Sequence, residues 1–117
     1  MTNKEILDIE AVRERLNDDS ELLADIVAIF LDHCSEALAT IQRDIISQDS
    51  KALEKSAHML RGYLVSLHAE RASQTALELE IKGRLDDCVG IRYLFSKLEE
   101  EIEQLKPLLK QCAKGCA

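Results

Sequence analysis

The sequence predicts an all-α protein, an antiparallel four-helix bundle with a short additional N-terminal helix. Three observations predict it. Apolar residues recur every three or four positions through most of the chain, which is the spacing of one helix face. Only four Gly and one Pro interrupt the 117 residues, so long helical windows remain. Aromatic residues make up only 3% of the chain, which leaves a core of Leu, Ile, Val and Ala, as in interdigitating helices.

Five helices follow from the apolar spacing. Their stripes span residues 9–16, 23–45, 53–67, 69–83 and 91–109. The polar residues 17–20 can cap the second helix, and Asp49 or Ser50 is the candidate N-cap of the third. The connections are short, so sequential helices are expected to run antiparallel. The tail beyond Pro107 is expected to fray, because proline lacks the backbone N–H that a helix interior uses.

Composition and charge narrow the class of protein. With 46% hydrophobic and 32% charged residues, the chain is expected to fold as one globular domain over residues 1–117. A net charge of -7 disfavours binding to nucleic acid. No apolar run reaches the roughly 18 residues of a membrane span, and the N-terminus lacks the apolar core of a signal peptide. We therefore expect a cytoplasmic protein that does not bind membranes. The initial Met and a first helix that starts within about ten residues favour a free-standing protein over a piece of a longer kinase, and a monomer is expected; both alternatives, an excised domain and a dimer, stay open.

The four cysteines are Cys34, Cys88, Cys112 and Cys116. Without a secretion signal they are expected to be reduced thiols rather than disulfides. Cys112 and Cys116 are four residues apart, but no paired C-x-x-C set accompanies them, so a zinc site is not expected. None of the three histidines belongs to a Glu-x-x-His pair either, because the residues three positions before them are Phe30, Lys55 and Val65, so the carboxylate type of metal-binding bundle is not expected.

His58 is the histidine whose surroundings suggest a function. On a helical wheel it lies roughly 140° from the centre of its apolar stripe, so it points outward. Lys55 and Arg61 lie three residues before and after it, and Glu54 lies four residues before it. Two cations beside an exposed imidazole can balance the charge of an added phosphoryl group. An alternative stays open at this point, in which His58 is an ordinary solvated histidine.

Gly62 lies one turn after His58 on the same exposed face. Glycine in a helix interior costs about 0.8–1 kcal/mol relative to Ala, so stability does not explain it. The missing side chain opens the space that a phosphoryl group or a docking protein needs, and Val65 adds an exposed apolar contact there. By contrast, His33 is expected to be a surface or partly packed residue, and His68 to lie at a helix end, where the dipole favours an imidazolium.

Residues 56–62, Ser-Ala-His-Met-Leu-Arg-Gly, resemble the A-H-x-L-[KR]-G signature of histidine-containing phosphotransfer (HPt) domains. The more distant A-x-x-L-E pattern of that family is matched by Ala76, Leu79 and Glu80. The order of helices in the family also covers nearly the whole chain. The departures are Tyr63 in place of a small residue, Ser66 in place of a frequent Asn, and His68 in place of Gly.

The resemblance implies a role for each site residue. His58 would be the phosphoacceptor, Arg61 would steady the phosphoryl group, and Gly62 would keep the imidazole accessible. Glu80 would hydrogen-bond the imidazole from the neighbouring helix, which fixes the tautomer and leaves the other ring nitrogen as the nucleophile. Lys55 has a less constant counterpart in the family.

The function implied is that of a phosphocarrier without kinase activity of its own in a two-component phosphorelay. It would accept a phosphoryl group from a receiver-domain aspartate and pass it to another receiver. The expected partners are receiver domains and a hybrid sensor histidine kinase, and the chain needs no cofactor because Mg²⁺ is expected on the receiver. The alternative is a non-catalytic helical adaptor in which His58 is incidental. An enzyme acting on a small molecule is disfavoured, because a filled bundle core leaves little room for a pocket.

Overall fold

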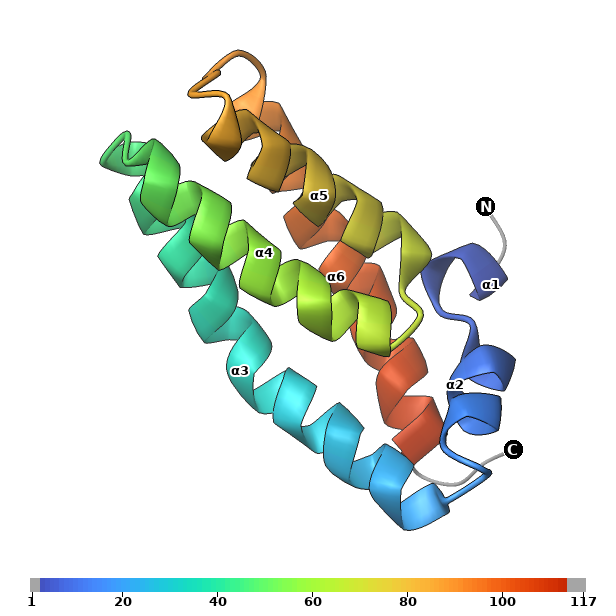
Figure 1. The fold of residues 1–117 in the computed structure, drawn as a ribbon. Helices are drawn as coiled ribbons and strands as arrows, with labels where there is room; N and C mark the ends of the chain where they lie inside the picture. Colours follow the sequence, from blue (N-terminus) through green and yellow to red (C-terminus); the bar gives the residue numbers. More distant parts are fainter. Residues whose placement is uncertain (1–2, 114–117) are drawn as a thin grey trace.

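The computed structural model describes residues 3–113. Its elements are α1 (Asn3–Ile6), α2 (Ile9–Arg15), α3 (Ser20–Ile46), α4 (Ser50–Ser66), α5 (Glu70–Arg84) and α6 (Ile91–Ala113). No strand occurs among these residues, which confirms the all-α class. Helices α3 to α6 run up and down in a four-helix bundle, and each packs against two of the others (Figure 1).

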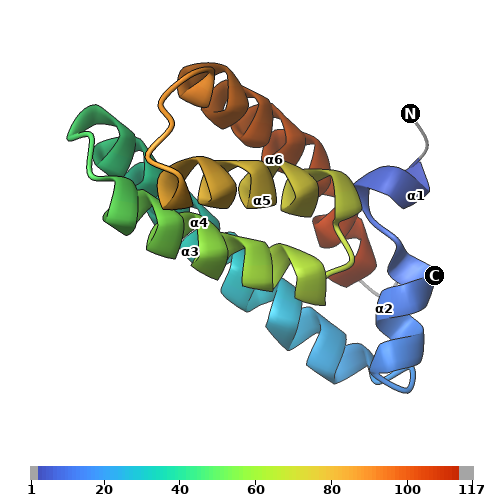
Figure 2. The same ribbon diagram turned by 45° about the horizontal axis from the view of Figure 1, so that its top comes forward.

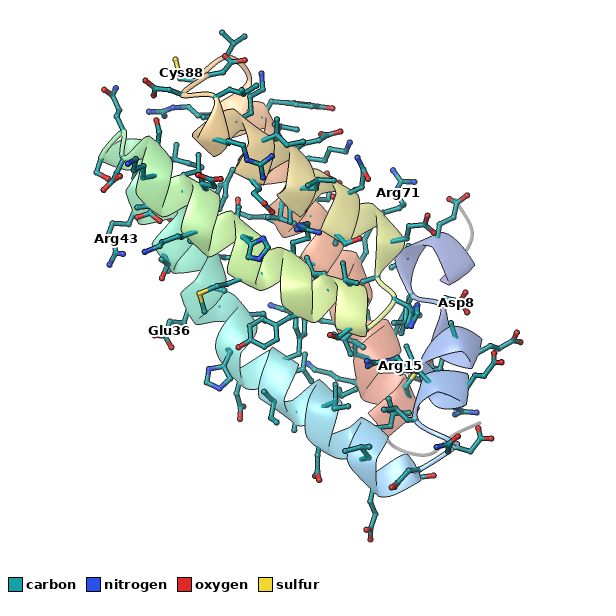
Figure 3. All side chains as sticks on the ribbon, in the orientation of Figure 1. Asp8, Arg15, Glu36, Arg43, Arg71 and Cys88 are labelled. Atoms are coloured by element: carbon teal, nitrogen blue, oxygen red, sulfur yellow. The ribbon has the colours of Figure 1, made fainter. Side chains whose placement is uncertain are left out.

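The N-terminal segment forms two short helices where the sequence predicted one. Helix α1 is a single turn, too short to show a periodic apolar stripe in the sequence. It packs on α5 and α6, and Leu7, the residue just after it, is buried. Asp8 caps α2 through its side chain, and its backbone N–H donates to the carbonyl of His68 at 3.1 Å. Arg15 donates to the carbonyl of Ser66 at 2.7 Å. Figure 3 shows Asp8 and Arg15 on the segment beside the α4–α5 turn.

The helix ends follow from local chemistry. Asp19 and Asp49 are the N-caps of α3 and α4, and each accepts a hydrogen bond from the backbone N–H three residues later. The residues that follow the C-caps of α3, α4 and α5 are Gln48, His68 and Asp86, with φ of 56°, 53° and 52°. This is the left-handed conformation that usually falls to glycine at a helix end. These tight ends make the three connections short.

The expectation that the chain frays beyond Pro107 is wrong. Helix α6 continues through this proline to Ala113. Pro107 is exposed, while Leu105 and Leu109 on either side are almost completely buried. The packing of these leucines in the core outweighs the one backbone hydrogen bond that proline removes.

Helices α4 and α5 form the most extensive helix pair, and both views show them side by side (Figures 1 and 2). Two of the small residues predicted on α5, Ala72 and Ala76, are buried. At Gly83 the backbones meet: a Cβ there would lie 2.7 Å from the amide nitrogen of Glu54 and 2.8 Å from the carbonyl oxygen of Ser50. Backbone contact therefore sets the spacing of the two helices.

Two further sequence expectations concern membranes and cysteines. Between residues 3 and 113, no helix combines the length and the hydropathy that a membrane span requires. Cys34, Cys88 and Cys112 are free thiols, and burial raises the pKa of the Cys112 thiol. Cys116, the second member of the Cys112 pair, lies outside the described residues.

Candidate functional site

His58 lies in the middle of α4 and presents its imidazole to solvent, with 62% of the side chain exposed. Its Nδ1 atom lies 3.2 Å from Oε1 of Glu80 on α5. The other ring nitrogen, Nε2, is left without a partner among the described residues. The imidazole is thus both accessible and held in place from one side.

Glu80 is a buried carboxylate between α4 and α5, with its side chain only 5% exposed. Its Oε1 accepts a hydrogen bond from Nε of Arg61 at 2.8 Å, in addition to the contact with His58. Its Oε2 accepts one from Nη2 of Arg84 at 2.9 Å. A buried carboxylate is expensive unless it is paired and hydrogen-bonded, and here both oxygens have cationic partners.

The electrostatics of Glu80 favour its charged form. Burial by itself raises the pKa of this carboxyl group. The hydrogen bonds and charges of Arg61 and His58 act in the opposite direction and bring the pKa below its ordinary value of 4.5. Glu80 is therefore an anion at neutral pH, able to accept the Nδ1 proton of the imidazole.

The other predicted site residues surround His58 on α4. A shallow hollow of about 600 Å³ lies beside the imidazole, and Glu54, Lys55 and Met59 line it together with His58 and Glu80. Lys55 is exposed. The carboxylate of Glu54 is already engaged within the chain, because Nε of Arg84 donates to it at 3.1 Å.

Gly62 and Val65 complete the exposed face of α4. A Cβ at Gly62 would meet no atom within 4 Å, so the space above the imidazole is open. Val65 is 51% exposed, and Met59 and Tyr63 on the same helix are 64% and 41% exposed. The face around His58 is thus a mixture of an exposed imidazole, two basic residues and uncovered apolar side chains.

Sequence reasoning missed Arg84 as part of this site. The i, i+4 spacing from Glu80 is the signal that points to it, but many helical pairs share that spacing. A second missed feature is the hydrogen bond of 2.8 Å from the hydroxyl of Ser56 to the buried carboxylate of Asp44 on α3. It links the helix that carries His58 to its neighbour on the opposite side from α5.

The remaining histidines lie apart from this group. His33 is exposed on α3, and His68 occupies the left-handed position after α4. Within residues 3–113, no group of three or more His, Cys, Asp or Glu side chains is arranged to hold a metal ion.

Comparison with known proteins gives the same interpretation. The family model described as "Hpt domain" matches residues 25–107. Comparison with curated protein sequences gives no significant match. Among solved structures, the chain is similar to the crystal structure of histidine-containing phosphotransfer protein B (HptB) from Pseudomonas aeruginosa PAO1. That likeness has a TM-score of 0.86 at 20% sequence identity, covers 93% of this chain and 95% of that chain, and so shows a shared fold.

The family model spans more than half of the chain and includes all of α4 and α5. The predicted phosphorelay function agrees with it. The chain therefore belongs to the Hpt domain family, whose members carry phosphoryl groups on a histidine in phosphorelays.

Proposed function

We propose that His58 is the phosphoacceptor of this carrier and that it takes the phosphoryl group on Nε2 from the aspartate of a receiver domain. The observation that carries the proposal is an imidazole that is 62% exposed and yet held at Nδ1 by a buried carboxylate, Glu80. A histidine that is merely exposed to solvent has no need of a buried carboxylate partner.

The chemistry follows from the tautomer. When Glu80 accepts the proton on Nδ1, the lone pair of Nε2 is free to attack phosphorus. The N–P bond forms as the P–O bond of the receiver's acyl phosphate breaks, and the electron pair of that bond returns to the aspartate carboxylate. The ring keeps its Nδ1 proton and becomes positively charged, and the anionic Glu80 offsets that charge. The reverse sequence passes the phosphoryl group to a second receiver.

The supporting residues act by position and charge. Phosphoryl transfer needs charge stabilisation more than covalent help from the protein, and Arg61 and Lys55 can supply positive charge on either side of the imidazole. We expect Mg²⁺ to be held by the receiver, and the phosphoryl group to originate from ATP through a hybrid sensor histidine kinase. We also expect this chain to act in the cytoplasm, as a monomer without kinase activity.

The receiver is expected to dock on the face of α4 around His58. Val65 offers an apolar contact there, Gly62 leaves room above the ring, and Glu54 lines the hollow beside it. Apolar residues in the centre of a contact with charged residues at its rim are the usual composition of a protein interface.

The test is phosphotransfer from a panel of phosphorylated receiver domains, at neutral pH with Mg²⁺, to the wild type and to His58→Gln. His33→Gln is the matched control, because it makes the same change at an exposed histidine on another helix. We expect an acid-labile, alkali-stable label on the wild type and on His33→Gln, none on His58→Gln, and none on the wild type with ATP alone.

A label on His58→Gln would refute His58 as the acceptor. A folded wild type that no receiver labels, but that still binds receivers equally well with or without His58, would favour the adaptor alternative. Labelling by ATP alone would contradict the absence of kinase activity.

A further inference from the structure

We propose that Arg84 is a positioning residue for phosphotransfer, which holds Glu80 against His58 while Arg61 moves from Glu80 to the phosphoryl group. This inference rests on the proposed function of His58. Nη2 of Arg84 lies 2.9 Å from Oε2 of Glu80, and Nε of Arg84 lies 3.1 Å from Oε2 of Glu54. Its guanidinium therefore joins α5 to α4 on the side of the imidazole that faces α5.

The first step of the argument is a competition for Nδ1 of His58. Oε1 of Glu80 and Nη2 of Arg61 both lie 3.2 Å from this atom. A protonated Nδ1 donates to Glu80, whereas a bare Nδ1 accepts from Arg61, and the two hydrogen bonds exclude each other. Only the first leaves a lone pair on Nε2 for phosphorus. The contact with Glu80 is therefore the productive one, and the contact with Arg61 opposes it.

The second step concerns the position of Arg61. Nε of Arg61 donates to Oε1 of Glu80 at 2.8 Å, so this guanidinium is bound to the carboxylate before any phosphoryl group is present. A phosphoryl group brings three strong acceptor oxygens and negative charge to the other side of the ring. Arg61, whose side chain is 29% exposed, can exchange its contact with Glu80 for these oxygens. The same move ends the competition at Nδ1.

The third step is what Glu80 needs when Arg61 leaves. A carboxylate that is 5% exposed would lose one of its two cationic partners, and a buried charge without a partner is costly. Arg84 remains on Oε2 and keeps the charge compensated. Glu54 in turn engages Arg84, which disfavours the movement of Arg84 itself toward the phosphoryl group. The two arginines thus have different tasks, although both contact the same carboxylate.

The experiment compares the full chain with Arg84→Met, Arg84→Lys and the control Arg43→Met. Arg43 lies on α3 with its side chain 74% exposed, and its ion pair is with Asp44 at 3.6 Å (Figure 3). Its replacement therefore removes the same charge without touching a contact of His58, Glu80 or Glu54. Two properties are measured: the imidazole ¹⁵N NMR signals of His58, which report its tautomer, and the rate of phosphotransfer from a receiver under saturating and subsaturating conditions. Circular dichroism and Tm verify folding, which is expected because the Arg84 side chain is half exposed.

For Arg84→Met we expect a shift of His58 toward the tautomer with the proton on Nε2 and a fall of about tenfold in the saturated transfer rate, with the receiver concentration at half-saturation unchanged. Arg84→Lys should restore part of both effects, and Arg43→Met should change neither. An unchanged tautomer or an unchanged rate in Arg84→Met would overturn the inference. If no receiver labels the wild type, the proposed function fails, whereas the NMR signals still decide whether Arg84 positions Glu80.

Discussion

Replacing Gly83 by alanine tests how closely α5 lies on α4. The added methyl group would lie 2.7 Å from the amide nitrogen of Glu54 and 2.8 Å from the carbonyl oxygen of Ser50. Both are backbone atoms, so α4 itself would have to shift. Alanine gains about 1 kcal/mol over glycine in a helix interior, whereas overpacking costs about 1–3 kcal/mol or more. Because backbone atoms cannot rotate away, we expect a net loss of about 1–2 kcal/mol in the free energy of unfolding.

Gly62→Ala is the matched control on the neighbouring helix. A Cβ at Gly62 would meet nothing within 4 Å, so only the helix propensity changes and stability should rise by about 0.8–1 kcal/mol. Urea unfolding followed by circular dichroism measures both variants. In a domain of this size, 1 kcal/mol corresponds to a shift of about 4 °C in Tm. The two substitutions should move Tm in opposite directions.

A Gly83→Ala variant that is as stable as the wild type would refute the backbone contact between α4 and α5. A Gly62→Ala variant that loses stability would show that Gly62 is needed for the fold. The presence of glycine at 62 would then no longer argue for access to His58.

Three other predictions concern buried charge, pH and a helix end. Glu101→Leu should raise the free energy of unfolding, measured in urea, by about 1 kcal/mol. The reason is that Oε1 of this buried carboxylate lacks a hydrogen-bond partner in the described residues, while Oε2 lies 3.7 Å from Arg71. A Glu101→Leu variant that is less stable than the wild type would contradict this. The pKa of Glu80 is lower in the folded state than its ordinary value of 4.5. The charged carboxylate therefore stabilises the fold above pH 4.5, and this stabilisation is lost as the pH falls through the folded-state pKa. Lowering the pH below 4.5 should therefore reduce the free energy of unfolding of the wild type more than that of Glu80→Gln. A difference between the two proteins that does not change with pH would contradict this. His68→Gly should raise Tm, by an amount that corresponds to about 1 kcal/mol, since φ is 53° there; an unchanged Tm would count against strain at this turn.

The bundle was predictable because its helices are long and their apolar stripes are regular. The stripes revealed α3 to α6, and aspartates at the predicted positions cap two of them. Helix α1 was not predictable, because a single turn has no period to detect. The continuation of α6 past Pro107 was mispredicted because a local rule about proline was applied where the burial of Leu105 and Leu109 decides.

Some contacts of the site are between residues of one helix and could be predicted from the sequence, whereas others are between two helices and could not. The arrangement of Arg61 and Gly62 around His58 follows from helical spacing alone, since all three lie on α4. The contact with Glu80 was expected only from the family resemblance. Spacing within one helix does not tell which face of α5 meets α4. For the same reason the sequence did not reveal Arg84, or that the guanidinium of Arg61 is bound to Glu80.

The His58, Glu80 and arginine contacts all lie within one helical hairpin, α4 and α5, whose spacing is set by backbone contact at Gly83. Helices α3 and α6 complete the core but contribute none of these atoms. Substitutions in α3, α6 and the N-terminal segment are therefore expected to change the stability and the surface of the bundle more than the contacts of His58. The hairpin is thus the unit that fixes the geometry around His58. It is also the unit to transfer when the chemistry is to be built into another helical bundle.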